Sequence, residues 1–175
     1  MDHVRLTEGE LLDYSGEHVA YEAQMFLCSY HFVFSAIDWN LSAPTPVPKN
    51  LRKWTVEMAL LEAVVAHARV LLNFLYPSFT RADDVIAGDF FDEAEQWEKI
   101  RPKLSERLKT MRQRASKELA HLTTKRIAGT PSNKEYRSED FEQLWEVVRL
   151  FAARASPSRL HQNVRDLGRR SIALG

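Results

Sequence analysis

The sequence predicts an all-α protein, a bundle of four to five helices arranged mainly up-and-down. Apolar residues recur at three- and four-residue steps over four long segments, which is the spacing of one helix face. No segment alternates apolar and polar residues as a half-buried strand does. Only 6 glycines occur in 175 residues, and the prolines stand at the ends of the four segments or between them.

The composition is that of one soluble helical domain over residues 1–175. This length is enough for one core, and the hydrophobic (45%) and charged (27%) fractions are those of ordinary globular proteins. Lys+Arg and Asp+Glu number 24 each, so no net charge draws the chain to nucleic acid or to a membrane. The one cysteine, Cys28, excludes an intrachain disulfide, and the N-terminus has no signal-peptide pattern. We therefore expect a cytoplasmic protein.

The first two predicted helices are joined by a proline-rich connection. The first covers about residues 17–38, and three prolines within residues 42–48 end it. The second covers about residues 51–76 and is closed by Pro77. Because this second helix carries apolar residues on nearly all sides, we expect it at the centre of the bundle.

The longest apolar stretch lies inside this second helix, from residue 58 to residue 76. Glu62, His67 and Arg69 interrupt it. Three ionisable groups are costly in a lipid core, so we expect a buried helix and no membrane association.

Two further helices follow. Residues 78–101 predict short turns whose aromatic residues pack on the core. A third helix is predicted over about residues 102–124, opened by a proline in its first turn. A fourth is predicted over about residues 138–155, with Ser138 as its N-cap. The tail, residues 158–175, either adds a short basic helix or frays.

The third predicted helix bears a line of polar residues along the border of its apolar stripe. Arg114 and His121 are seven residues apart, about 700° of helix rotation, which places them within about 20° of one face. Such border positions suit an arginine that binds phosphate and a histidine that acts as general acid or base. The alternative is structural: Arg114 pairs with Glu118 one turn on, and His121 covers the core edge.

The second predicted helix contributes a companion group. Glu62, Arg69 and Asn73 are spaced by seven and four residues, so they share a face. On a helix with so few polar residues, each needs a partner or water. Glu62 either positions a cation from another helix or belongs to an ordinary ion pair between helices.

The segment from Arg114 to His121 (Arg-Ala-Ser-Lys-Glu-Leu-Ala-His) resembles the Arg-x(4–6)-His motif of HEPN domains. These are short all-α domains of prokaryotic toxin, antivirus and RNA-processing systems. The order of a central helix (residues 62–75) and a following helix with the motif is also similar, so the resemblance covers about residues 51–126. It implies a metal-independent endoribonuclease without a cofactor, acting on RNA as a homodimer. It further implies that Arg114 binds the scissile phosphate, that His121 moves the proton of the 2′-hydroxyl or of the leaving oxygen, and that Glu62 supports them.

A second function class stays open. Active HEPN domains often carry Asn, Asp or His directly after the motif arginine, whereas this chain has Ala115. Other members of the family are binding or assembly modules. The alternative to a ribonuclease is therefore a non-catalytic helical interaction protein in which Arg114 and His121 are structural.

Metal chemistry finds less support. Glu118 and His121 form one Glu-x-x-His unit, but helical di-iron sites need a second unit, and the chain has none. A mononuclear site would need residues from separate helices that no pattern brings together: His18, Glu22, His67 and His121. We therefore expect no metal and no cofactor.

One basic cluster occurs near the C-terminus. It either contacts RNA phosphates or belongs to a solvated tail or a subunit contact. Its members are Arg159, His161, Arg165, Arg169 and Arg170.

Overall fold

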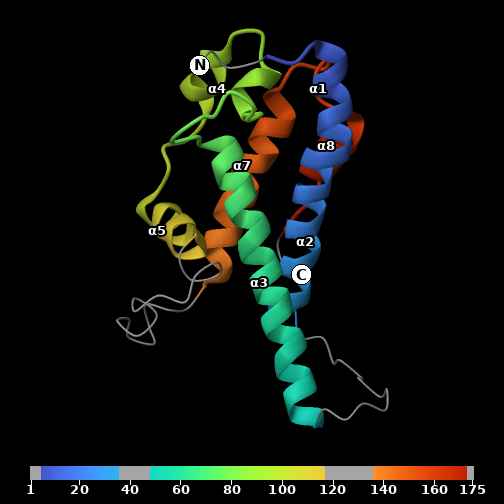
Figure 1. Ribbon diagram of the computed structural model, residues 1–175, viewed down its shortest axis with the longest axis vertical. Helices are drawn as coiled ribbons and strands as arrows, with labels where there is room; N and C mark the ends of the chain where they lie inside the picture. The colour runs from blue at the N-terminus through green and yellow to red at the C-terminus, as the bar shows by residue number, and fades with distance from the viewer. Residues whose placement is uncertain (1–4, 36–47, 117–135, 173–175) are drawn as a thin grey trace.

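A computed structural model describes residues 5–35, 48–116 and 136–172. Every regular element in these ranges is a helix, which confirms the predicted all-α fold. Figure 1 shows the elements, which are in chain order α1 (Glu8–Tyr14), the π-helix η1 (Ser15–Val19), α2 (Ala20–Phe34), α3 (Lys49–Leu75), the 3-10 helix η2 (Ala87–Phe90), α4 (Ala94–Ile100), α5 (Glu106–Arg114), α7 (Ser138–Arg154) and α8 (Gln162–Gly168).

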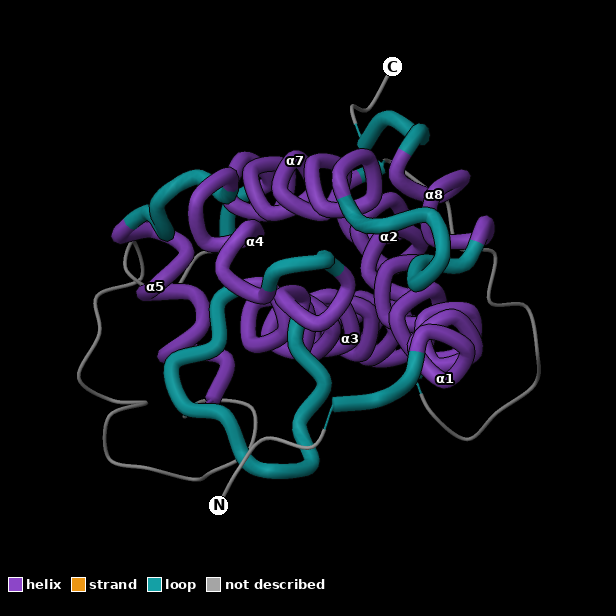
Figure 2. Tube along the Cα trace, turned by 90° about the horizontal axis from the view of Figure 1, so that it is seen from above, coloured by secondary structure: helices purple, strands orange, loops and turns teal. Residues whose placement is uncertain are grey.

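Three long helices form the frame of the bundle. Figures 1 and 2 show α2, α3 and α7 side by side, with α2 running antiparallel to the other two. α5 packs on α3 and α7 at one side, and α8 packs on α7 and α2 at the other. The predicted up-and-down bundle is therefore confirmed. The core between the long helices is rich in aromatic rings, and the ring of Phe26 stacks on that of Trp145 at 5.9 Å.

The first helical segment begins earlier than predicted, at Glu8 rather than near residue 17. The reason is a capping box at Thr7. The Thr7 hydroxyl oxygen accepts the backbone N–H of Glu10 at 3.3 Å, and the Glu10 carboxylate accepts that of Thr7 at 2.8 Å. These bonds satisfy donors that a helix start leaves without partners. α2 ends at Phe34, and the rest of the predicted 17–38 helix lies outside the described residues.

α3 occupies nearly the whole of the predicted 51–76 helix, but it is not covered all round. Its C-terminal half lies in the core, whereas its N-terminal half extends beyond α2 in Figure 1. There Leu51 is 47% and Trp54 58% exposed. By length and composition, α3 also meets the requirements of a membrane span, as the core helices of soluble bundles do.

The segment between α3 and α5 folds back on the bundle, as predicted. Phe90 of η2 and Trp97 of α4 are buried, and the Trp97 ring lies 5.7 Å from that of Phe151 on α7. The Trp97 indole N–H donates to the carbonyl oxygen of Leu75 at 2.8 Å. This bond satisfies a carbonyl at the end of α3 that has no partner within the helix.

The later helices differ from prediction mainly at their starts. α5 begins at Glu106, not Pro102, because Ser105 caps it by accepting the N–H of Leu108 at 3.3 Å. The part of the predicted 102–124 helix beyond Ser116 lies outside the described residues. α7 matches the predicted 138–155 helix, although its N-cap is Arg137 rather than Ser138. Within the predicted tail, the chain forms α8, and the last three residues are not described.

Candidate functional site

The structure describes one residue of the predicted catalytic pair. Arg114 is the last residue of α5, where it is half-buried. Its guanidinium carbon lies 4.4 Å from the centroid of the Tyr136 ring, just before α7. Stacking on an aromatic face restrains a guanidinium, and the N–H donors still point outward in the plane of the guanidinium. Ala115 is buried, so the Asn or Asp that active HEPN domains often carry here would have to be buried as well.

Of the other two predicted site residues, the structure describes only Glu62. His121 lies outside the described residues, as do Glu118 and Lys125. Glu62 is exposed on α3 and does not contribute to the core. The distance between Arg114 and His121 is therefore part of the proposal and not of the described structure.

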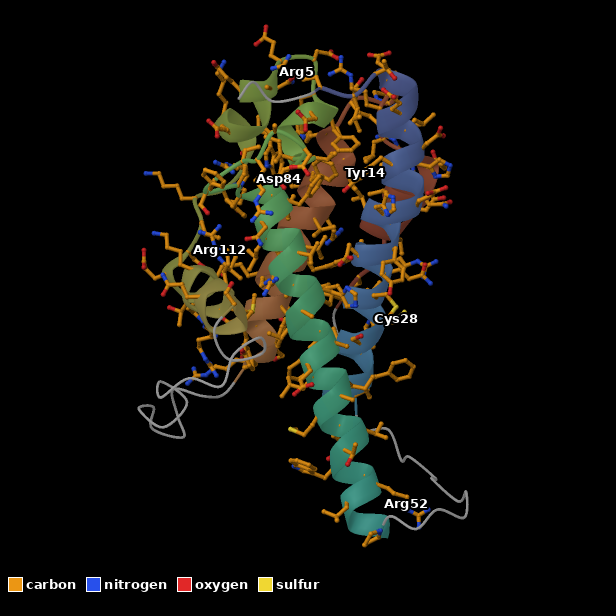
Figure 3. The ribbon with its side chains drawn as sticks, viewed as in Figure 1. Arg5, Tyr14, Cys28, Arg52, Asp84 and Arg112 are labelled. Atoms are coloured by element: carbon orange, nitrogen blue, oxygen red, sulfur yellow. The ribbon has the colours of Figure 1, made fainter. Side chains whose placement is uncertain are left out.

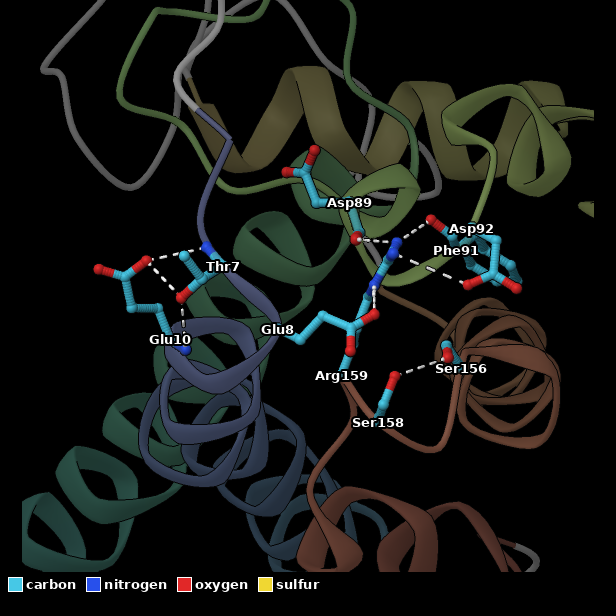
Figure 4. A network of polar contacts seen from close by, with 9 residues as sticks. All are labelled: Thr7, Glu8, Glu10, Asp89, Phe91, Asp92, Ser156, Ser158 and Arg159. Carbon is cyan, nitrogen blue, oxygen red and sulfur yellow. Dashed lines mark hydrogen bonds and ion pairs between the residues drawn. The ribbon is translucent and has the colours of Figure 1, made fainter.

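The basic C-terminal cluster is largely used inside the fold. Figure 4 shows that the Arg159 guanidinium donates to the carbonyl oxygens of Asp89 and Phe91. It also forms ion pairs with Glu8 at 3.1 Å and with Asp92 at 3.7 Å. Arg159 therefore ties α1, η2 and the connection between α7 and α8 together, and it is not a free phosphate contact.

The neighbouring basic residues have similar roles. Arg165 donates to the carbonyl oxygens of Ala152 and Ala155 at 3.3 and 3.0 Å, at the end of α7. The side chain of His161 caps α8. Cations at a helix C-terminus satisfy carbonyls that lack partners and complement the helix dipole. Most of this cluster therefore stabilises the fold.

A polar cleft lies elsewhere, and no motif in the sequence predicted it. Its walls are the α1–η1–α2 segment, the C-terminal half of α3 and the connection that follows α3. Its volume is about 690 Å³, within the range of small-molecule sites. Figure 3 shows Tyr14 and Asp84, which line it, at the same end of the molecule.

Between α2 and α3, at one side of this cleft, lies a carboxylate–imidazole pair. The Glu22 carboxylate lies 2.7 Å from Nδ1 of His67, and both side chains are mostly buried. His67 is half-buried and lies at the edge of the core. Glu22, His67 and His18 were weighed as metal ligands, and the structure joins only the first two, while His18 lines the cleft. In the described part of the chain, no group of three His, Cys, Asp or Glu side chains could hold a metal ion.

The π-helix η1 shapes the wall opposite α3. It follows Tyr14 directly and contains His18, and the two rings lie 4.7 Å apart. Burial raises the pKa of Tyr14, and the negative charges of Glu22 and Asp84 raise it further. These effects favour the protonated hydroxyl, which is a hydrogen-bond donor. Short π-segments recur at functional sites, because they shift side chains relative to the α-helical repeat.

The sequence did contain one signal for this cleft. Tyr14, His18 and Glu22 are spaced by four residues, so they form a polar row along one side of the first helical segment. Arg69 and Asn73, grouped with Glu62 in the sequence, line the cleft, whereas Glu62 does not.

This chain matches no protein family, curated protein or solved structure with which it was compared. Its relation to HEPN domains is therefore a proposal.

Proposed function

We propose that this protein is a HEPN-like, metal-independent endoribonuclease of a defence or toxin–antitoxin system, acting in the cytoplasm as a homodimer. The observation that supports this most is the position of Arg114. It stands at the end of α5, half-buried and restrained on the Tyr136 ring, next to the segment that carries His121. The all-α bundle agrees with the resemblance but does not by itself imply an activity.

The proposed reaction is an internal transfer at one phosphodiester. The 2′-oxygen of the ribose attacks the adjacent phosphorus, its proton leaves to a base, and the bond to the 5′-oxygen breaks. The 5′-oxygen takes up a proton, so the products carry a 2′,3′-cyclic phosphate and a 5′-hydroxyl. Arg114 stabilises the charge on the phosphate oxygens, and His121 moves one of the two protons.

A restrained arginine suits the first of these roles. A guanidinium presents N–H donors in a fixed plane that matches two phosphate oxygens. Because Arg114 is stacked, less side-chain freedom is lost when it binds a phosphate. Glu62, two turns before Arg69 on an exposed face, has at most a supporting role.

The test is RNA cleavage in EDTA by the wild-type protein and by Arg114→Ala, His121→Ala and Arg107→Ala. We expect the first two variants to lose about a hundredfold or more in rate, the usual range for a general acid–base or charge-stabilising group. Arg107→Ala is the matched control, because Arg107 stands on the same helix outside the motif and pairs with Asp140. Equal rates in all four proteins would refute the assignment.

The competing proposal is a non-catalytic helical interaction protein. Stacking on Tyr136 is by itself a structural role for Arg114, and this observation favours that reading. The two proposals differ in the same assay. Under the competing proposal, the purified protein cleaves no RNA in EDTA, and Arg114→Ala lowers only thermal stability.

A further inference from the structure

The cleft beside α3 is lined by carboxylates near α2 and η1 and by the guanidinium of Arg69 on α3, and Arg81 and Asp83 add one charge of each sign from the connection after α3. Measured around the axis of α3 from His67, Phe74 lies about 20° away and Val70 about 60° away. In the same direction, Asn73 lies about 120° away and Arg69 about 160° away. The order across this surface is therefore a polar pair, two apolar side chains, and then an amide and a guanidinium. Phe74, Val70, Asn73 and Arg69 all line the cleft.

The acidic end lies next to α2 and η1. Glu22 is bonded to His67 there, and its second carboxylate oxygen has no hydrogen bond within the described chain. Asp84 accepts the backbone N–H of Arg81 at 2.7 Å, which fixes its carboxylate at the rim. Burial is the main cause of the raised pKa of Tyr14, and the charges of Glu22 and Asp84 raise it further. Such an end attracts a protonated amine.

The basic end has a cation, Arg69, that pairs with no carboxylate of the described residues. Arg69 is half-buried, and within the part of the chain that the structure describes it forms no ion pair. Asn73, one turn further on the same side of α3, adds an amide. A partly buried guanidinium gains from a charge-assisted hydrogen bond, so this end suits a carboxylate or another small anion.

The apolar surface between the ends faces open space. Val70 is exposed, although it belongs to the half of α3 that packs in the core. Phe74 lies beside it, and its ring is held by that of Phe151 at 5.1 Å. A hydrocarbon chain laid across these two side chains removes apolar surface from water.

We propose that this cleft binds a small zwitterion whose amine and acid groups are separated by an apolar chain. The amine lies at Glu22 and Asp84, the acid at Arg69 and Asn73, and the chain crosses Val70. Because the ends are separated by most of the width of α3, about 10 Å with side chains, several carbons must separate the charges. This site is separate from Arg114 and His121, and the inference does not depend on ribonuclease activity.

The test uses three probes of equal length: 6-aminohexanoate, hexanoate and hexylamine. Each is titrated into the ¹⁵N-labelled full chain, and affinity is read from amide shifts of cleft residues. We expect 6-aminohexanoate to bind up to about fivefold more tightly than either single-charge probe, because one partly exposed ion pair contributes at most about 1 kcal/mol. Equal affinities for the three probes, or no shifts at cleft residues, would overturn the proposal.

Two variants test which residues bind the acid group and the amine of the probe. In Arg69→Gln, the affinity for 6-aminohexanoate should fall to that for hexylamine. In Glu22→Gln, which keeps an oxygen near His67, it should fall to that for hexanoate. If Glu22→Gln does not fold, Asp84→Asn at the rim gives the same comparison. Unchanged affinity in Arg69→Gln refutes the proposal.

A matched control lies on α4. Glu95→Gln removes an exposed carboxylate that pairs with Lys99, outside the cleft. It should leave the affinity for all three probes unchanged. Loss of binding in this control as well would show that bulk charge, rather than the cleft, holds the probes.

Discussion

Both halves of α3 carry large apolar side chains, but the two halves differ in environment. The C-terminal half is enclosed by α2, α7 and the segment that includes α4, and Leu72 and Leu75 are fully buried there. The N-terminal half extends beyond α2, and Leu51 and Trp54 are largely exposed (Figure 1). A helical repeat shows which side chains share a face, but it does not show how far along the helix its neighbours reach.

The difference also explains where the cleft lies. At its enclosed end, α3 is met by helices from two directions, and the connection after residue 76 has to pass around it. The exposed Val70 and the half-buried Arg69 lie where these neighbours do not close over the helix. We infer that the polar residues in the C-terminal half of α3 line a cleft because of how the neighbouring helices and the connection pack around this half. Their spacing in the sequence is not enough by itself.

The largest predicted effect comes from a matched pair of tryptophans. Trp97→Ala, at the enclosed end, removes a fully buried ring and a hydrogen bond to Leu75, and should lower the free energy of unfolding by about 3–5 kcal/mol. Trp54→Ala, at the extended end, should change it by no more than about 0.5 kcal/mol. Urea unfolding followed by circular dichroism measures both. Similar losses would show that something covers Trp54 in solution.

A second pair sharpens the comparison within one helix and one residue type. Leu72→Ala should cost about 2–5 kcal/mol, because the cavity it leaves is surrounded by core side chains. Leu51→Ala should cost at most about 0.5 kcal/mol. Thermal unfolding and urea unfolding should both show the larger loss of stability for Leu72→Ala. A larger loss from Leu51→Ala than from Leu72→Ala would contradict the described burial.

The smallest effect concerns the hydroxyl that closes the buried end of α3. Tyr76 donates to the carbonyl oxygen of Pro102 at 3.0 Å, and burial raises its pKa, while the charge of Arg101 acts in the opposite direction. A raised tyrosine pKa stabilises the fold below about pH 10, the unfolded value, and this stability is lost as the pH rises further. Tyr76→Phe should cost about 0.5–1.5 kcal/mol at pH 8.

The measurement is urea unfolding at pH 8 and at pH 11. Between these values, Tyr76→Phe should lose less stability than the wild-type protein, because it has one tyrosine fewer to ionise. Tyr14 and Tyr30 also have raised pKa values and remain in both proteins, so some loss persists in the variant. A variant that loses more stability than the wild type would contradict the assignment.

Much of the fold was predictable from the sequence. The four main segments are long and strongly periodic, and they were found, because burial on one face leaves a clear pattern. Their starts were less certain. Thr7 and Ser105 cap helices whose first turns are mostly polar, and a search for apolar stripes does not detect such caps, so α1 was missed and α5 was placed too early.

The cleft was less predictable than the fold. Its polar row on α1, η1 and α2 becomes a site only when Asp84 and α3 are packed beside it, and that contact spans a long sequence separation. The interrupted repeat at η1 has no clear signal in composition. Arg69 stood out in the sequence as a charge in an apolar stretch. Its position on α3, across from His67, places it in a cleft only because of how the neighbouring segments pack on α3.

The most direct test of the proposed function compares two RNA oligonucleotides of one sequence, one with ribose throughout and one with 2′-O-methyl groups throughout. Each is incubated with the purified wild-type protein in EDTA. Because the 2′-hydroxyl is the proposed nucleophile, the account predicts cleavage of the first, with a cyclic phosphate end, and none of the second. Cleavage of both, or of neither, would contradict it.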